Sequence, residues 1–159
     1  MKRSALGITV VVVASFSFPA LAGDVTYSKD IRPLMEKKCF ACHGGAASPY
    51  YGDFKKDKKK YEAAMKGPRM DTYADVLYFV GWPDTGALMR RLDDGKNAKG
   101  GKPGNMYGFL GSSDDERQKN LKKFKAWVGE DGWVLNRWKA RGDVPAVTKE
   151  QVSKMKVKY

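Results

Sequence analysis

Histidine and cysteine are scarce in this sequence of 159 residues, which has one histidine and two cysteines. A single histidine excludes a zinc site built on several histidines of the chain, and it leaves only His43 for a histidine-based catalytic triad. Cys39 and Cys42 are three positions apart, which excludes a disulfide framework spanning the fold. Acidic residues are also few, because 18 Asp and Glu stand against 30 Lys and Arg. The resulting net charge of +12 suggests acidic partners.

Long hydrophobic runs are missing except near the N-terminus. Residues 5–18 are apolar or small and uncharged; they follow Lys2 and Arg3 and precede a small-x-small pattern that ends at Ala22. This arrangement is typical of an export signal cleaved after Ala22, and the run is short for a membrane span. We therefore expect a periplasmic mature chain of residues 23–159, whose net charge falls from +12 to +10 with the loss of Lys2 and Arg3. A retained N-terminal anchor is the alternative.

The segment Cys39-Phe40-Ala41-Cys42-His43 is a C-x-x-C-H sequence, the motif of covalent haem attachment. Each thiol adds across one vinyl group of the haem, and two intervening residues match the separation of the vinyls. His43 then lies beneath the iron and donates a ring nitrogen. The alternative is a thioredoxin-like redox pair, which requires a βαβ setting that the sequence does not show. In the oxidising compartment to which we expect the chain to be exported, two nearby cysteines form a disulfide unless another reaction consumes the thiols, and haem attachment is such a reaction. A haem held by two histidines of this chain is excluded because the sequence has one.

Three segments resemble class I c-type cytochromes, which are small soluble monohaem proteins: YSKDIRPLMEKKCFACHG, GWPDTGALMRRLDDG and SSDDERQKNLKKFKAWV. The second has Gly86 where such domains often have Ser. The resemblance covers roughly Asp24 to Trp133 and implies an all-α cytochrome c fold, with about four to five short helices round one covalently bound haem. The first and last of these helices cross in the family. We expect a signal peptide over 1–22, a cytochrome c domain over 23–133 and a C-terminal extension over 134–159 that packs on it.

Apolar periodicity predicts helices that agree with this resemblance. The first begins between Ser28 and Asp30, because Pro33 is tolerated only near a first turn. A second carries residues 73–80 and stops at Gly81. A third follows Pro83 and ends at Gly95, with Asp84 as its N-cap.

The strongest helix signature is near the C-terminus of the domain. Ser113 and Glu116 form an S-x-x-E capping box, and a stripe of Leu121, Phe124 and Val128 follows it. In the extension, Thr148 and Gln151 predict a short final helix with Val152 and Met155 facing inward. Trp133 and Trp138 are expected to cover apolar surface.

Two basic segments, residues 55–60 and 96–104, are predicted to be loops. A solvated surface is the ordinary explanation of such lysine runs. The functional interpretation is a ring of positive charge, including Lys96, Lys99 and Lys102, that docks an acidic partner at the haem edge.

The second axial ligand of the iron is sought among the six methionines after residue 22. Met35 and Met89 fall at helical spacing with core residues, and Met155 lies in the extension. The remaining candidates are Met65, Met70 and Met106. The resemblance implies an axial methionine from an irregular loop before the last helix, which is where Met106 lies. Met106 is flanked here by Asn105 and Tyr107, whereas a Met-Pro-Pro sequence is common at this place in the family. Met70, or an open or lysine-filled position, is the alternative.

The resemblance implies a periplasmic single-electron carrier and not an enzyme. It would use one haem c bonded to Cys39 and Cys42, with His43 and Met106 as axial ligands of the iron. We expect a monomer with acidic redox protein partners, periplasmic or membrane-associated, with no nucleic-acid partner and no transmembrane span in the mature form. One alternative is a haem enzyme or gas sensor with an open sixth position, where Arg69 or a tyrosine replaces a distal histidine. Another is an electron-transfer subunit of a larger redox complex that docks through its C-terminal extension.

Overall fold

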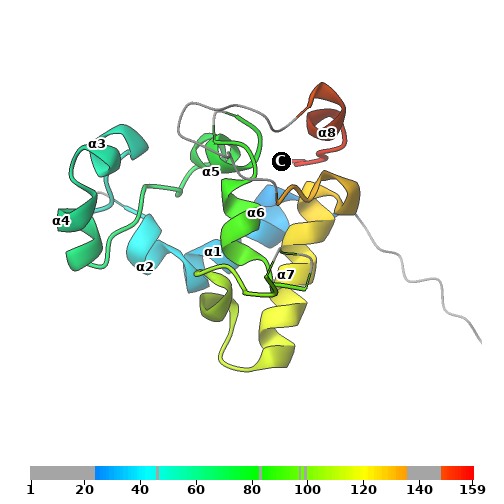
Figure 1. Cartoon of the computed structure of the whole chain (residues 1–159), viewed down its shortest axis with the longest axis horizontal. Helices are drawn as coiled ribbons and strands as arrows, with labels where there is room; N and C mark the ends of the chain where they lie inside the picture. The colour runs from blue at the N-terminus through cyan, green and yellow to red at the C-terminus, as the bar shows by residue number, and fades with distance from the viewer. Residues whose placement is uncertain (1–23, 46, 83, 97, 99, 136–147) are drawn as a thin grey trace, which may run out of the picture.

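The computed structural model describes residues 24–45, 47–82, 84–96, 98, 100–135 and 148–159; the expected signal peptide lies outside these ranges. Within them all regular structure is helical and no strand occurs, as predicted (Figure 1). The elements are η1 (Tyr27–Ile31), α1 (Arg32–Lys38), α2 (Phe40–His43), α3 (Tyr51–Lys56), α4 (Lys58–Ala63), α5 (Tyr73–Val80), α6 (Ala87–Leu92), η2 (Tyr107–Leu110), α7 (Asp114–Val128), η3 (Glu130–Gly132) and α8 (Lys149–Ser153). No helix in the described part of the chain has the length and apolar character needed to cross a membrane.

The first helical segment begins with the π-helical turn η1, one residue before the predicted range. Thr26 caps it by accepting a hydrogen bond from the Lys29 amide. Pro33 then falls in the first turn of α1, where its missing N–H costs little. The buried side chains of Ile31 and Met35 direct this segment towards the core.

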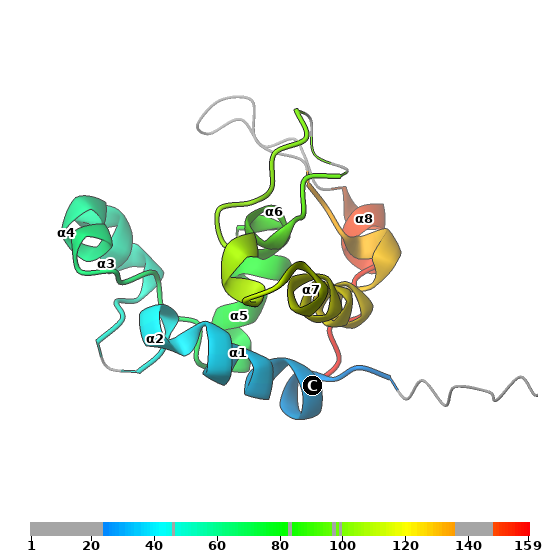
Figure 2. The same ribbon diagram turned by 90° about the horizontal axis from the view of Figure 1, so that it is seen from below.

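Helix α7 packs against η1, so the first and last helices of the domain meet (Figure 2). The predicted stripe is confirmed, because Leu121, Phe124 and Val128 are all buried. Ser113 caps the helix through its hydroxyl, which accepts the Glu116 amide. The second hydrogen bond of the predicted capping box is not formed as expected. The Glu116 carboxylate accepts the amide of Ser112, at 2.8 Å, and not that of Ser113.

Helix α5 covers the predicted residues and ends at Gly81, but the start and end of α6 differ from the prediction. The N-cap of α6 is Gly86, in the left-handed conformation with φ of +74°. Asp84 instead accepts a hydrogen bond from the Tyr51 hydroxyl, and it pairs with Arg90 at 3.3 Å. The helix ends at Leu92 and not at Gly95, because the next residue is already extended.

Residues 51–63 form two short helices, α3 and α4, and not the predicted loop. They project from the rest of the molecule (Figures 1 and 2), and we call them the lysine arm. Asp57 caps α4 by accepting the Lys60 amide. The Phe54 and Tyr61 rings stack between the two helices, with centroids 6.2 Å apart. Lysines in both helices form ion pairs with acidic residues three or four positions away, and such pairs stabilise helical turns. The prediction of a loop considered the number of lysines and not these pairs.

The C-terminal residues pack beside the end of α7. The predicted final helix is present as α8, and Thr148 and Gln151 form a capping box at its start. Val152 is 42% exposed, so its predicted inward orientation is wrong. The chain then runs along α7, where the amide of residue 156 donates to the carbonyl of Val128 at 2.8 Å. Trp138 lies outside the described residues.

Candidate haem site

The C-x-x-C-H segment lies where α1 gives way to the single turn of α2. Cys39 leaves the helical conformation, and its carbonyl accepts the amides of Cys42 and His43 at 3.1 and 2.9 Å. Both thiols are unpaired and half-buried. Burial raises the pKa of the Cys39 thiol to about 11. Redox-active C-x-x-C pairs have lowered thiol pKa values, so this environment does not favour the thioredoxin-like alternative.

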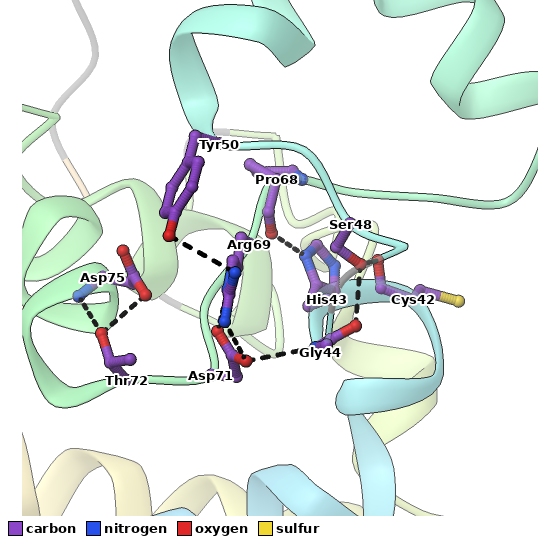
Figure 3. Close-up of polar contacts among 11 residues, drawn as sticks. Cys42, His43, Gly44, Ser48, Tyr50, Pro68, Arg69, Asp71, Thr72 and Asp75 are labelled. Atoms are coloured by element: carbon purple, nitrogen blue, oxygen red, sulfur yellow. Dashed lines mark hydrogen bonds and ion pairs between the residues drawn. The ribbon is translucent and has the colours of Figure 1, made fainter.

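The imidazole of His43 has one nitrogen engaged by the protein. Its Nδ1 lies 2.8 Å from the carbonyl oxygen of Pro68 (Figure 3). A carbonyl accepts only, so Nδ1 carries the proton and the lone pair of Nε2 is left for a metal. Burial lowers the pKa of His43 and the charge of Arg91 lowers it further, while the Pro68 bond opposes them. The net effect favours the neutral imidazole, which is the form that binds iron.

Gly67 is a site residue that the sequence did not reveal. A Cβ atom at this position would lie 2.0 Å from Cε1 of His43, so only glycine lets the backbone approach the imidazole so closely. The Gly67 amide donates to the Cys42 carbonyl, and that of Met70 donates to the His43 carbonyl, each at 2.8 Å. The Gly-Pro dipeptide at 67–68 marks a turn but gives no sign of its partner.

The Asp71 carboxylate, which is paired with Arg69, fastens this segment to the loop that follows His43 by accepting a backbone hydrogen bond. Arg69 Nε lies 2.5 Å from Asp71 Oδ1, and Asp71 Oδ2 accepts the Gly45 amide at 3.2 Å (Figure 3). Arg69 Nη1 also donates to the Tyr50 hydroxyl, at 3.3 Å. Arg69 lowers the pKa of the Asp71 carboxyl through its hydrogen bond. The guanidinium is therefore engaged beside Pro68, on the Nδ1 side of the imidazole, and this position does not favour a distal role.

Met106 lies at the end of an irregular segment that is tied to the C-terminal end of α6. Its amide donates to the Arg91 carbonyl at 2.9 Å, and its side chain is half-buried against the core. The Arg91 guanidinium also binds Oδ1 of Asn105, at 2.7 Å. Gly104 packs so closely on α6 that an added Cβ would lie 2.3 Å from the Arg91 carbonyl oxygen. The position of Met106 is thus fixed through its neighbours.

The other methionines have clear surroundings. Met35 and Met89 are fully buried, as expected for core residues, and the Met89 sulfur accepts the Val134 amide at 3.0 Å. Met70 is buried beside the His43 backbone, whereas Met65 is 77% exposed. Met155 packs at the edge of the core.

The two predicted lysine groups do not lie together. In Figure 2 the lysine arm lies at the left of the molecule, whereas the segment that carries Lys96 and Lys102 projects at the top. Lys99 lies outside the described residues. The chain that follows the lysine arm reaches the C-x-x-C-H segment, because Lys66 Nζ donates to the Ala41 carbonyl at 3.0 Å.

These residues fit a haem c. One small region brings together two unpaired thiols and an imidazole with a free Nε2, and Gly67 packs directly against that imidazole. The sequence model of the PccH cytochrome c family matches residues 26–159. The chain belongs to this family. Its structure is similar to that of the monoheme cytochrome PccH from Geobacter sulfurreducens, with a TM-score of 0.73 and 51% identity over 86% of this chain and 100% of that chain. No protein with a curated description matches.

Membership in the PccH cytochrome c family confirms the predicted monohaem cytochrome c and its all-α fold. It implies one haem c and supports an electron-carrier role. The family match includes residues 134–159, which we predicted to be an extension. The boundary at residue 133 stays a prediction.

Proposed function

We propose that the protein is a periplasmic single-electron carrier and not an enzyme. Cys39 and Cys42 would hold the haem through thioether bonds, and His43 and Met106 would be the axial ligands of its iron. The observation that carries the proposal is the His43 Nδ1 contact with Pro68 at 2.8 Å, which leaves Nε2 for the iron. When bound, the haem supplies one-electron chemistry between ferrous and ferric iron.

The surroundings of the methionines support Met106 over Met70. Pro68 lies at Nδ1, on the side of the imidazole opposite the Nε2 that would bind the iron. Met70 follows Pro68 by two residues and binds the His43 backbone, so its segment belongs to that remote side. Met106 comes from a separate segment that is anchored on α6. Its thioether is free of the helical constraint that holds Met89 against Val134.

The role of the chain follows from this ligand set. If His43 and Met106 filled both axial positions, small molecules would not reach the iron, and electron exchange would be the activity left to the protein. The protein then orients the imidazole through Pro68 and shields it by the close approach of Gly67. A methionine ligand raises the reduction potential relative to two nitrogen ligands.

The partners we propose are acidic redox proteins, periplasmic or membrane-associated, that a monomer of this chain meets on the side of the lysine arm. Lys66, just after the arm, holds the chain against the C-x-x-C-H segment, where the haem would be attached. Lys55 and Lys60 lie over the Tyr51 and Tyr61 rings at 5.5 and 5.6 Å, which holds their charges on the surface of the arm. Such a field speeds encounter with an anionic surface.

The spectrum of the oxidised protein tests the ligand set. We expect the near-infrared charge-transfer band of a methionine–iron bond. Met106→Ala should abolish this band and create a carbon monoxide site in the reduced protein, whereas Met70→Ala should retain the band. If the band persists in Met106→Ala and disappears in Met70→Ala, the assignment of the ligand is wrong. Binding of carbon monoxide by the unsubstituted protein would favour the gas sensor instead.

A further inference from the structure

Asp93 carries a buried carboxylate: the residue is 1% exposed, and the side chain of its neighbour Asp94 is nearly buried as well, at 5%. Asp93 follows the last residue of α6 and precedes the segment that leads to Met106. Its Oδ2 accepts the Gly95 amide at 2.9 Å, and its backbone carbonyl accepts the Gly104 amide at 2.8 Å. One residue thus holds both ends of the segment 93–104, close to where Met106 begins its approach to the core.

The neck of this segment is narrow. Gly95 has φ of +87°, and a Cβ there would lie 2.7 Å from the carbonyl oxygen of Gly101 and 2.8 Å from the nitrogen of Pro103. The two sides of the neck therefore touch without intervening side chains. Such close packing depends on the Asp93 bonds to Gly95 and Gly104, since the backbone amides would otherwise turn to water.

The second oxygen of the Asp93 carboxylate is held from outside the segment. Trp133 lies just beyond η3, and its Nε1 donates to Asp93 Oδ1 at 3.3 Å. The Trp133 indole is itself fixed, because Lys125 Nζ lies over its ring at 5.7 Å and the next amide binds the Met89 sulfur. The chain after the last domain helix is thereby connected to the segment that carries Met106.

We propose that Asp93, oriented by Trp133, is the positioning residue that keeps Met106 directed at the haem iron. The inference rests on the proposed ligation by His43 and Met106. A ligand on an irregular segment dissociates whenever that segment loosens, so the contacts at its neck set how often the iron position opens. Loss of the indole N–H leaves one oxygen of a buried carboxylate without its donor, which weakens the neck.

Cyanide binding to the oxidised holoprotein at fixed pH and salt tests this role, because cyanide occupies the position that Met106 vacates. Trp133→Phe keeps an aromatic ring and removes the donor. It should raise the apparent cyanide affinity about tenfold, which corresponds to about 1.4 kcal/mol. Asp93→Asn leaves one of two N–H donors without an acceptor and should shift the affinity in the same direction.

Trp127→Phe is the matched control. Trp127 is fully buried, and its Nε1 donates to the Lys158 carbonyl at 2.9 Å, at the end of the chain and away from the 93–104 segment. The Trp127→Phe variant should have a lower free energy of unfolding and an unchanged cyanide affinity. Unfolding is followed in parallel by urea titration, so a general loss of stability is separated from a loosened ligand.

The possible outcomes separate the two proposals. If Trp133→Phe resembles Trp127→Phe, with weakened folding and an unchanged cyanide affinity, the positioning role is refuted although the ligation stands. If the unsubstituted protein lacks the methionine band, the proposed ligation fails and the role of Asp93 fails with it. If the band is present and only the Asp93 and Trp133 variants bind cyanide more tightly, both proposals are supported.

Discussion

Lys38 at the end of α1 and Glu116 in the first turn of α7 form an ion pair, with Nζ and Oε1 2.6 Å apart. The pair joins the first and last helices of the domain beside the haem motif. The Lys38 ammonium, with the Ser112 amide and hydroxyl, lowers the pKa of the Glu116 carboxyl to about 2. The carboxylate is thus stabilised in the folded protein.

This pKa predicts an acid dependence of stability. Because the folded pKa lies below the unfolded one, the contribution of Glu116 is complete above about pH 4.5 and is lost as the pH falls towards about 2. Glu116→Gln should therefore be less stable than the unsubstituted protein at pH 6, and the difference should shrink by pH 3. Urea titrations at both pH values measure it. Glu36→Gln is the control, since the Arg32–Glu36 pair is exposed and joins neighbouring turns of one helix. An equal acid dependence in both variants would contradict the prediction.

Gly67→Ala should displace His43. The new Cβ would lie 2.0 Å from the imidazole, and overpacking of this kind costs about 1–3 kcal/mol. We expect lower stability together with a changed haem spectrum, because the imidazole that would bind the iron has to move. Gly52→Ala in α3 is the matched control, since a Cβ there meets no atom within 4 Å. It should leave the spectrum unchanged and should not destabilise the protein. A normal spectrum in Gly67→Ala would show that close packing of residue 67 against the imidazole is not required.

Haem attachment and export are tested by mass. The purified mature protein should have the mass of residues 23–159 plus one haem, because both thiols add to vinyl groups and cleavage follows Ala22. The haem should stay with the protein in acidified organic solvent. Cys39→Ser should keep a single thioether bond through Cys42. Haem that extracts from the unsubstituted protein would contradict covalent attachment, and a retained N-terminus would support the membrane anchor.

The lysine arm should direct anionic reactants to the haem. We expect electron transfer with ferricyanide to slow by about tenfold or more between 0.01 and 0.1 M salt, as the Debye length falls from about 30 to about 10 Å. The double variant Lys59→Glu, Lys60→Glu should slow this reaction and flatten its salt dependence. Lys59→Glu would lie in the first turn of α4, where negative charge is favourable, whereas Lys60 is in the last turn of this short helix. Circular dichroism of the double variant checks that its helix content is unchanged.

A charge-matched control separates the local effect from net charge. Lys154→Glu with Lys156→Glu alters the charge by the same amount, at the C-terminal end of the chain beside Val128 and far from the arm. It should have a smaller effect. The reaction with the cationic hexaammineruthenium should change in the opposite direction in the arm variant, which rules out damage to the haem. Equal effects from both pairs would mean that only net charge matters.

The chemistry of the haem motif was predictable from the sequence, because two thiols and an imidazole at fixed spacing define an attachment site within five adjacent residues. The helices α5 and α7 were predictable for a similar reason, since caps and apolar stripes act over one or two turns. The start of α6 was not, because the chain uses the left-handed conformation of Gly86 while Asp84 is engaged by Tyr51, a residue far away in sequence.

Contacts between distant segments were decided by the tertiary structure alone. The sequence determined that His43 is the one available imidazole and that Met106 precedes the last helix. Only packing brought Gly67 and Pro68 against His43, and only packing joined Trp133 to Asp93, 40 residues earlier. The physical reason is the separation in sequence of the residues involved. The spacing of the haem motif and the helix caps depend on neighbouring residues, whereas the orientation of a ligand depends on surfaces that meet only when the chain has folded.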